Sequence, residues 1–309
     1  MKPIQIGPHF VGGDNPPYLL AEIGINHQGD IDIAMRMIRA AKEAGAHGVK
    51  FQTFRADKLF NPKYAPAEHA KFKALELDYD QFAALHMYAS QVGIDFISTP
   101  FDLDSLDFLV ELGVPAIKIA SGDLTYTPLL EAAGASGKPV ILSTGMADSI
   151  DLSCAKWSLM AKGCGELILL HCVSLYPVSP EHAKLGRIRS MPTYQDCGPE
   201  GCITTFPCDC MRGYSDHTIG NHACIAAVAL GAVFIEKHFT LDHDLPGDDH
   251  KLAANPQELA ELATILEETY IMVKNEMWDV TGPELAKRGA MRRNPIDWLR
   301  PLERDDGAD

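Results

Sequence analysis

Short apolar runs rich in β-forming residues alternate with helical patterns along almost the whole chain, and this alternation restricts the possible folds most. Each run is apolar enough for a strand that is covered on both faces. We predict eight strands, over residues 19–24, 48–54, 95–100, 116–121, 139–144, 166–172, 211–217 and 233–239. Helical patterns between them include residues 31–44, 81–92, 103–112 and 256–275. Eight such units predict an α/β fold of the (β/α)8 TIM-barrel class.

Two stretches interrupt the alternation. We expect residues 61–80 to form a long loop after the second strand, and residues 191–210 to form a Cys/Pro/Gly-rich insertion before the seventh. Long loops in compact domains are usually functional or disordered. A chain of 309 residues still fits one barrel. We therefore predict a single barrel domain over residues 1–285 and a tail over residues 286–309, without a second domain.

The charge and hydropathy of the chain exclude several classes of partner. Its 27 basic and 42 acidic residues give a net charge of −15, which disfavours nucleic acid and anionic membranes. No apolar run approaches the roughly 18 residues of a membrane span. The first 13 residues contain Pro3 and Pro8 and lack the pattern of a signal peptide. We expect a soluble cytoplasmic protein with no membrane or nucleic-acid partner.

Four of the eight cysteines crowd into the predicted insertion: Cys197, Cys202, Cys208 and Cys210. In a cytoplasmic protein, such residues are more often thiols or metal ligands than a disulfide framework. A structural zinc site is one interpretation. The spacing C-x4-C-x5-C-x-C lacks the common C-x2-C pattern, so thiols that are free or incidentally oxidised are the alternative.

Polar residues gather where the predicted strands end, which is the face that carries the active site in this class of barrel. Any one of them could instead be a satisfied polar group of the core or rim. In chain order they are Glu22, Asn26, His27, Lys50, Gln52, Lys118, Ser121, Asp123, Ser143, Thr144, His171, Ser174, Tyr176, Ser215, Asp216, His217, Glu236 and His238.

Two lysines stand inside otherwise apolar strands. An unpaired ammonium group at Lys50 or Lys118 would be costly there, so we expect a bound anion or a carboxylate partner. With the hydroxyl groups of Ser121, Ser143 and Ser215, the lysines suit a ligand that carries phosphate and carboxylate. The alternative is that they form ion pairs with Glu22 and Glu236.

Two histidines end neighbouring predicted strands. His217 and His238 would thus lie within reach of one metal ion, with oxygen ligands or water completing its shell. Two imidazoles without a thiolate suit Mn²⁺ or a similar divalent ion better than structural zinc. The alternative is a pair of histidines that serve only as polar groups of the rim.

An ordered set of motifs resembles the sialic acid synthase (N-acetylneuraminate synthase) family over roughly residues 17–275. The motifs are AEIGINHQGD (21–30), VKFQTF (49–54), KIASGDL (118–124), LSTGM (142–146), HCVSLYP (171–177), GYSDHTIG (213–220), EKHFTLD (236–242) and PGDDHK (246–251). The resemblance implies a metal-dependent transferase. Its members condense phosphoenolpyruvate with N-acetylmannosamine or a related 2-acetamido sugar into a nine-carbon 2-keto acid and phosphate.

The resemblance also implies a role for each matching residue. Lys50, Lys118, Ser121, Ser143 and Ser215 would hold phosphoenolpyruvate, and His217 and His238 would bind the divalent metal. Gln52, Asp123, Ser174, Tyr176 and Asp249 would face the sugar. Glu22 would act in proton transfer or water activation, with Lys50 and Lys118 as the other catalytic residues.

Some features depart from the family pattern. Members often carry Glu at the position of Asp123 and Asn at that of Ser174, and they lack the Cys-rich insertion. They usually continue into a small antifreeze-like domain that gives an arginine to the partner's site in a dimer. We expect a homodimer here, with a replacement lid from residues 61–80, residues 197–210, or Arg288, Arg292 and Arg293. Another phosphoenolpyruvate–aldose synthase and a non-catalytic ligand-binding barrel are the alternatives.

Overall fold

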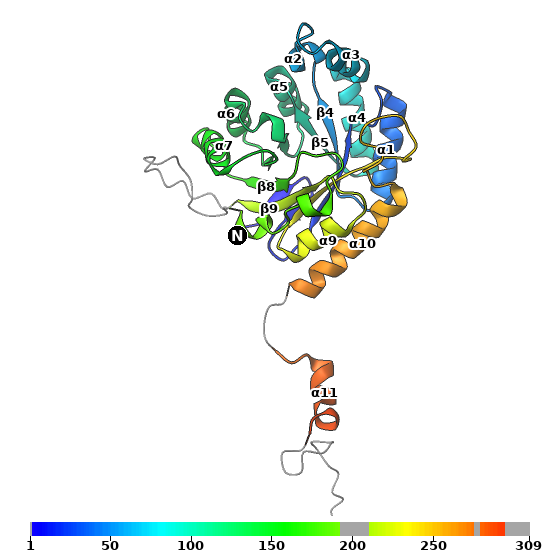
Figure 1. Cartoon of the computed structure of the whole chain (residues 1–309), viewed down its shortest axis with the longest axis vertical. Helices are drawn as coiled ribbons and strands as arrows, with labels where there is room; N and C mark the ends of the chain where they lie inside the picture. The colour runs from blue at the N-terminus through cyan, green and yellow to red at the C-terminus, as the bar shows by residue number, and fades with distance from the viewer. Residues whose placement is uncertain (1, 192–209, 275–278, 294–309) are drawn as a thin grey trace, which may run out of the picture. The chain divides into compact units, whose positions relative to one another are not determined.

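The computed structural model describes residues 2–191, 210–274 and 279–293 (Figure 1). The chain divides into two compact units, Met1–Met272 and Val273–Asp309. The first unit therefore ends before residue 285, where we expect the barrel domain to end. Within the described residues, no helix is both long and apolar enough to cross a membrane.

The first unit is a closed barrel of eight parallel strands, which confirms the predicted TIM-barrel class. Hydrogen bonding runs in the order β10-β3-β4-β5-β6-β7-β8-β9 around the ring, so the last strand pairs with the first. The strands are β3 (Tyr18–Gly24), β4 (Gly48–Thr53), β5 (Asp95–Pro100), β6 (Ile117–Ile119), β7 (Val140–Ser143), β8 (Leu167–Cys172), β9 (Met211–Asp216) and β10 (Phe234–His238).

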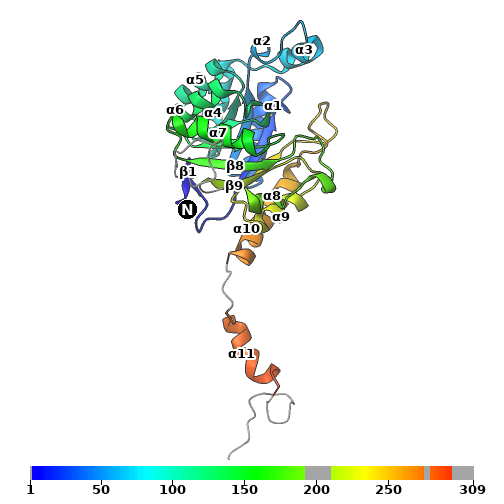
Figure 2. The same ribbon diagram turned by 60° about the vertical axis from the view of Figure 1, so that its left-hand side comes forward.

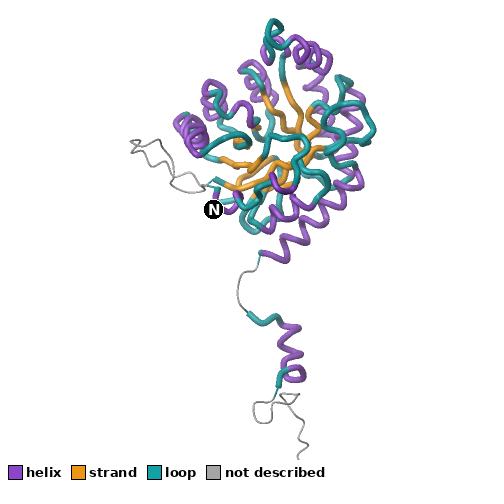
Figure 3. The backbone as a smooth tube through the Cα atoms, in the orientation of Figure 1, coloured by secondary structure: helices purple, strands orange, loops and turns teal. Residues whose placement is uncertain are grey.

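Helices surround the strands, as the two ribbon views and the tube show (Figures 1, 2 and 3). The main ones are α1 (Ile31–Glu43), α4 (Tyr79–Val92), α5 (Leu103–Leu112), α6 (Thr127–Ala135), α7 (Ser149–Ala161), α9 (His222–Ala229) and α10 (Pro256–Val273). Helix α1 shows why these segments are helical: its buried residues are Ala34, Met37, Ile38 and Ala41, one stripe at helical spacing. Asp30 caps its first turn by accepting hydrogen bonds from two backbone amides.

Smaller elements decorate the ring: the hairpin β1 (Ile4–Ile6) and β2 (His9–Val11), helices α2 (Ala56–Leu59), α3 (Pro66–Leu75) and α8 (Arg187–Ser190), and the 3-10 turns η1 (Ser121–Asp123) and η2 (Pro180–His182). Helix α3 corrects the expected loop over residues 61–80. None of its residues is buried, so the sequence there has no apolar stripe to signal a helix. Of the predicted insertion, residues 192–209 lie outside the described residues.

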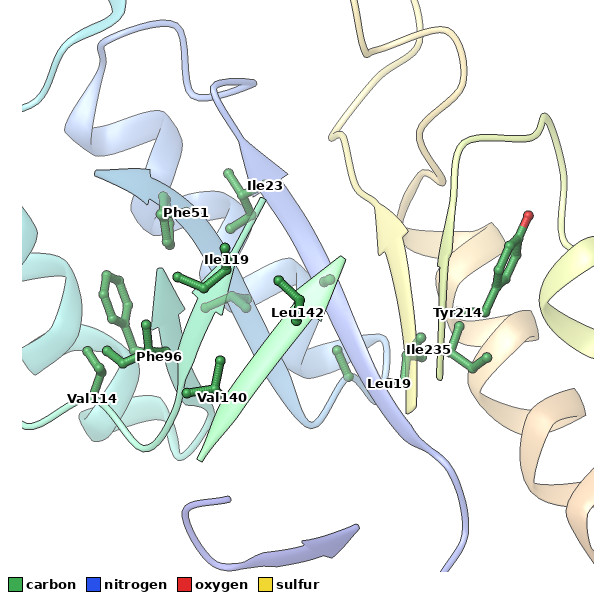
Figure 4. Packing of buried hydrophobic residues seen from close by; sticks show 14 of the residues in the cluster. Leu19, Ile23, Phe51, Phe96, Val114, Ile119, Val140, Leu142, Tyr214 and Ile235 are labelled. Carbon is green, nitrogen blue, oxygen red and sulfur yellow. The ribbon is translucent and has the colours of Figure 1, made fainter. Parts of the chain in front are cut away.

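The apolar core has two parts. Outward-facing side chains of the strands pack against the helices, and Figure 4 shows members of this cluster, such as Leu19, Phe51 and Leu142, on separate strands. Inward-facing side chains of the same strands, such as Leu20 and Ile141, pack with the β1–β2 hairpin in a second cluster. These apolar residues precede the inward-facing polar ones along each strand, so they form a floor beneath the strands' carboxyl ends.

The second unit contains one described helix, α11 (Gly282–Met291). Thr281 and Glu284 form a reciprocal capping box at its start, which explains why a helix begins here. None of its described residues is buried.

Candidate active site

A cavity of about 480 Å³ opens at the carboxyl ends of the barrel strands. All but one of the barrel residues to which the family resemblance assigns a role line it. They are Glu22, Lys50, Gln52, Lys118, Ser121, Ser143, Ser174, Tyr176, Ser215, His217, His238 and Asp249. Residues far apart in sequence thus meet here because each stands at or just after the end of a strand of the same ring.

A buried network of charges forms the bottom of the cavity. Lys50 Nζ lies 2.8 Å from Glu22 Oε2 and 3.8 Å from Glu236 Oε1, and Lys118 Nζ lies 3.9 Å from Glu236 Oε2. Lys118 also donates a hydrogen bond to Ser143 Oγ at 2.7 Å. Both lysines therefore lie beside carboxylates, as in the alternative interpretation of the sequence. The hydroxyl of Ser215 completes the network by donating to Glu236 at 2.8 Å.

The network shifts the titration of its members in different directions. Burial raises the pKa of Glu22 to about 7, although the charge of Lys50 opposes the shift. Burial lowers the pKa of Lys118, whereas for Lys50 the same effect is outweighed by the charges of Glu22 and Glu236, and its pKa is raised. Burial also acts to raise the pKa of Glu236, but the two lysines lower it. Glu22 is thus the carboxyl group suited to exchange a proton near neutral pH.

Two imidazole rings lie edge to face on one side of the cavity. The ring centroids of His217 and His238 are 5.2 Å apart, and Tyr176 stacks on His217 at 4.1 Å. His217 Nδ1 donates to the carbonyl of Val173 at 2.8 Å, which leaves Nε2 with its lone pair. Burial lowers the pKa of both histidines, so both rings are neutral at neutral pH.

These rings fit a metal site with two protein ligands. His238 Nδ1 is buried without a hydrogen bond within the described part of the chain, and it lies 3.6 Å from Asp249 Oδ2. Neutral imidazoles are the form that binds divalent ions. No cluster of three or more histidine, cysteine or acidic side chains with metal-binding geometry occurs among the described residues. Water or substrate oxygens would therefore have to complete the shell.

Asp123 is the predicted barrel residue that does not line the cavity. It belongs to η1, which directly follows β6, and it is half-buried. Burial raises the pKa of its carboxyl group to about 6. Its neighbour Ser121 faces the cavity and accepts a hydrogen bond from the backbone of Gly145 at 3.0 Å. The contact predicted between Asp123 and a sugar stays a prediction.

Two of the lining residues to which the family resemblance assigned no role lie next to the lysines and histidines of the site. Glu236 was expected as a polar residue at a strand end and as a possible partner for the lysines, and it lies near both of them. Cys172 Sγ lies 4.0 Å from both ring nitrogens of His217, and burial raises the pKa of the thiol. Strand alternation could have identified Cys172, because Leu170 on the same face is in the inner cluster. His171 faces the other way and bonds the carbonyl of Ala183.

An ion pair outside the cavity holds the backbone around His217. Lys237 and Asp216 are fully buried, with Lys237 Nζ 2.8 Å from Asp216 Oδ2. Lys237 also donates to the carbonyls of Thr218 at 2.6 Å and Gly220 at 2.9 Å. Residues on both sides of His217 are therefore fixed by one ammonium group.

Residues after β4, β5 and β10 form the outer wall of the cavity. Leu59, Phe60, Lys71 and Phe72 come from α2, α3 and their connection, and Phe101 follows β5. Across the mouth, Asp248 and Asp249 belong to the loop after β10, and Asp248 forms an ion pair with Lys71.

Two further groups of predicted residues are the four cysteines of the insertion and the arginines of the tail. Cys197, Cys202 and Cys208 lie outside the described residues, and Cys210 is buried next to the start of β9. The structural zinc site stays a prediction. Arg288 and Arg292 belong to α11 and its C-cap in the second unit.

A family model described as the NeuB family matches residues 37–277. The N,N'-diacetyllegionaminic acid synthase of Legionella pneumophila is 37% identical over 293 residues, which is 90% of this chain and 79% of that protein. The N-acetylneuraminate-9-phosphate synthase of Mus musculus is 39% identical over 264 residues, 82% of this chain and 70% of that protein. An uncharacterized protein of Methanocaldococcus jannaschii is 45% identical over 85% of this chain and 73% of its own length.

Solved structures show the same similarity. The crystal structure of N-acetylneuraminic acid (sialic acid) synthetase from Leptospira borgpetersenii, in complex with citrate, has a TM-score of 0.83 and 35% identity. The match covers 93% of this chain and 95% of that one. A truncated 3-deoxy-D-arabino-heptulosonate 7-phosphate synthase from Thermotoga maritima, at 15% identity and a TM-score of 0.66, shares the fold.

Proposed function

The chain belongs to the NeuB family, and from this premise we propose that it condenses phosphoenolpyruvate with a 2-acetamido aldose such as N-acetylmannosamine. The products would be a nine-carbon 2-keto acid and phosphate. The membership confirms the resemblance stated from the sequence. The observation that carries the proposal is one cavity that holds both a buried pair of lysines and an adjacent pair of neutral imidazoles.

Phosphoenolpyruvate would bind at the bottom of the cavity. Lys50 and Lys118 are the buried cations there, and Ser121, Ser143 and Ser215 provide hydroxyl groups among the same lining residues. A trianionic ligand compensates the cost of keeping ammonium groups out of water. The carboxylates of Glu22 and Glu236 would then keep the lysines charged while the ligand is absent.

The aldose would lie above phosphoenolpyruvate, with its aldehyde at the histidines. Gln52, Ser174, Tyr176 and Asp249 line the cavity and would offer hydrogen bonds to the sugar, and we keep Asp123 in the proposed set. His217 and His238 would hold Mn²⁺ or a similar divalent ion, which supplies a Lewis acid for the aldehyde oxygen.

In the proposed reaction, the terminal carbon of phosphoenolpyruvate forms a bond to the aldehyde carbon, the aldehyde double bond opens, and its oxygen takes up a proton to become a hydroxyl group. Water then adds to the carbon that carries the phosphate, and the bond from that carbon to the phosphate oxygen breaks. Glu22 takes the proton of the water, a step that suits a carboxyl group with a pKa of about 7. The two lysines neutralise the phosphate group until it leaves.

Phosphate release tests this function. Purified protein is mixed with phosphoenolpyruvate, Mn²⁺ and a panel of aldoses, and we expect phosphate with 2-acetamido aldoses. Excess EDTA should abolish the release until a divalent ion is restored. His217→Ala should be inactive yet folded by circular dichroism, whereas His182→Ala, an exposed histidine outside the cavity, should retain activity.

Other outcomes would reassign the protein. Full activity in excess chelator would contradict the metal-dependent mechanism. Release only with aldoses that lack the acetamido group would indicate another phosphoenolpyruvate–aldose synthase. Binding of phosphoenolpyruvate without turnover of any aldose would favour a non-catalytic barrel. We also propose a homodimer in the cytoplasm, which light scattering and cell fractionation test.

A further inference from the structure

The outer wall of the cavity is apolar on one side. Phe60 and Phe72 pack against each other with ring centroids 4.9 Å apart, and Phe54 contacts Phe72 at 5.3 Å and Phe101 at 6.4 Å. Phe60, Phe72 and Phe101 are each only partly buried and line the cavity. A ligand that reaches this wall would therefore meet aromatic surface, which favours methyl and acetyl groups over charged ones.

The charges at the mouth do not favour an anion. Three lysines line the cavity among the described residues, and two of them, Lys50 and Lys118, belong to the buried network. The third, Lys71, forms an ion pair with Asp248. Asp249 adds a second carboxyl group to the same lining. An arriving phosphate group would thus meet one ammonium group and two carboxylates, and repulsion outweighs attraction.

Three neighbouring cations of the β4–α4 connection are also paired, and Lys63 lies over the ring of Tyr64. Arg55 binds Glu76, and Lys73 binds the same carboxylate and Asp57. Lys58 binds Asp102 and Asp104. None of these three cations lines the cavity.

The far end of the aldose would point to this wall. Its aldehyde is expected at His217, which directly follows β9, and at His238 in β10. The aromatic wall follows β4 and β5. Strand β5 lies across the ring from β9, and β4 is separated from β10 by β3. The two buried lysines lie below and would be occupied by phosphoenolpyruvate, so they are not available for a second phosphate group.

We propose that the acceptor is a neutral 2-acetamido aldose with apolar substituents at the end remote from its aldehyde, and that Asp248 discriminates against aldoses phosphorylated at that end. This inference rests on the proposed function and deepens it by naming the substrate class. Phe60, Phe72 and Phe101 would contact the apolar substituents, and Asp248 would repel phosphate and occupy Lys71.

Three acceptors test the inference: N-acetylmannosamine, its 6-phosphate, and 2,4-diacetamido-2,4,6-trideoxymannose. We expect kcat/KM for the two neutral aldoses to exceed that for the 6-phosphate by about 100-fold, with the trideoxy sugar preferred. Asp248→Asn should raise kcat/KM for the 6-phosphate relative to N-acetylmannosamine by about tenfold at low ionic strength. Phe72→Ala should reduce the preference for the trideoxy sugar.

Asp244→Asn is the matched control, because Asp244 is an exposed carboxylate of the same loop that does not line the cavity. It should leave the ratio between the aldoses unchanged. A wild-type protein that prefers the 6-phosphate would overturn the inference while the proposed function stands. An equal effect of Asp244→Asn and Asp248→Asn would overturn the role of Asp248. Absence of phosphate release with all three acceptors would contradict the proposed function, and the inference with it.

Discussion

At the scale of single residues, replacing Lys118 would test whether the buried network of charges binds an anion. Its ammonium group donates to Ser143 and lies near Glu236, and Lys118→Met would keep most of the side-chain volume while removing the charge. We expect the affinity for phosphoenolpyruvate to fall by about 100-fold, because charge-assisted hydrogen bonds are lost. Calorimetric titration measures this. Unchanged affinity would mean that the lysine serves only its ion pair.

Lys237 shows how strongly burial changes the value of an ion pair. Lys237→Met would leave Asp216 as a buried charge without its partner, and we expect a loss of about 3–5 kcal/mol in the free energy of unfolding. Lys162 and Glu131 form an exposed pair for comparison, and Lys162→Met should cost less than about 1 kcal/mol. Urea unfolding of both variants makes the comparison. Equal losses would contradict a special role for the buried pair.

The lowered pKa of His47 predicts that the stability of the protein depends on pH. Burial, and then the charges of His9 and Lys42, lower its pKa to about 4 from an ordinary value of 6.5, and its Nδ1 accepts a hydrogen bond from the amide of Leu19. A depressed pKa means that its stabilising contribution is complete above about pH 6.5 and is lost as the pH falls towards 4.

Urea unfolding at pH 7 and pH 5 tests this dependence on His47. The wild-type protein should lose about 1–2 kcal/mol more of its unfolding free energy between these pH values than His47→Gln does. Parallel losses in the two proteins would assign the pH dependence to other groups. One such group is His27, whose pKa burial lowers to about 4.

At the scale of elements, the β1–β2 hairpin is held to the barrel by Asp95. His9 and Tyr18 both bind this carboxylate, at 3.0 and 2.9 Å. Gly7 in the hairpin turn has a φ of +55°, and a Cβ atom there would lie 2.0 Å from Asp95 Oδ1. We expect Gly7→Ala to lower the unfolding free energy by about 2 kcal/mol or more, since steric overlap adds to backbone strain.

Gly93 separates these two causes. It caps α4 with a φ of +74°, and a Cβ atom there would meet nothing within 4 Å. Gly93→Ala should therefore cost only the backbone strain, about 1 kcal/mol. If both glycine variants lose the same stability in urea unfolding, the contact between the hairpin and Asp95 contributes nothing.

Most of the barrel could be predicted from the sequence, because buried parallel strands and amphipathic helices leave periodic patterns. All eight strands occur where the apolar runs are, although β6 is shorter than residues 116–121 because its end turns into η1. The hairpin strands β1 and β2 escaped prediction, since three residues are too few to show a period.

The site residues that stand on strands could be predicted from the sequence, because the strands themselves could be. Alternation along β10 places Glu236 and His238 on the face opposite Lys237, as observed. The ion pair of Lys71 with Asp248, by contrast, joins two segments that follow different strands. No periodic pattern records such a contact, because it depends on how two irregular segments fold over the mouth.

At the scale of the whole molecule, the division into two units suggests an experiment in which the end of the second unit is removed. The first unit ends at Met272, and the described residues of α11 are not buried. A chain that ends before Gly289 should therefore unfold at the same temperature as the full chain. If the tail carries a replacement lid, we expect KM for the aldose to rise more than KM for phosphoenolpyruvate, because the latter would lie deeper in the proposed binding mode. Equal changes in both KM values, or none, would count against such a lid.

The closure of the ring by β10 and β3 has a consequence for biogenesis. Tyr18 and Phe234 pair although nearly the whole barrel unit separates them in the sequence, and contacts of such separation form slowly. Until β10 has left the ribosome, β3 and β9 each expose an edge that can recruit another chain. Glu22 stands on the first strand of the ring and His238 on the last. In a refolding experiment, catalytic competence should therefore appear after helical circular dichroism has recovered, because the site is complete only when the last strand pairs with the first.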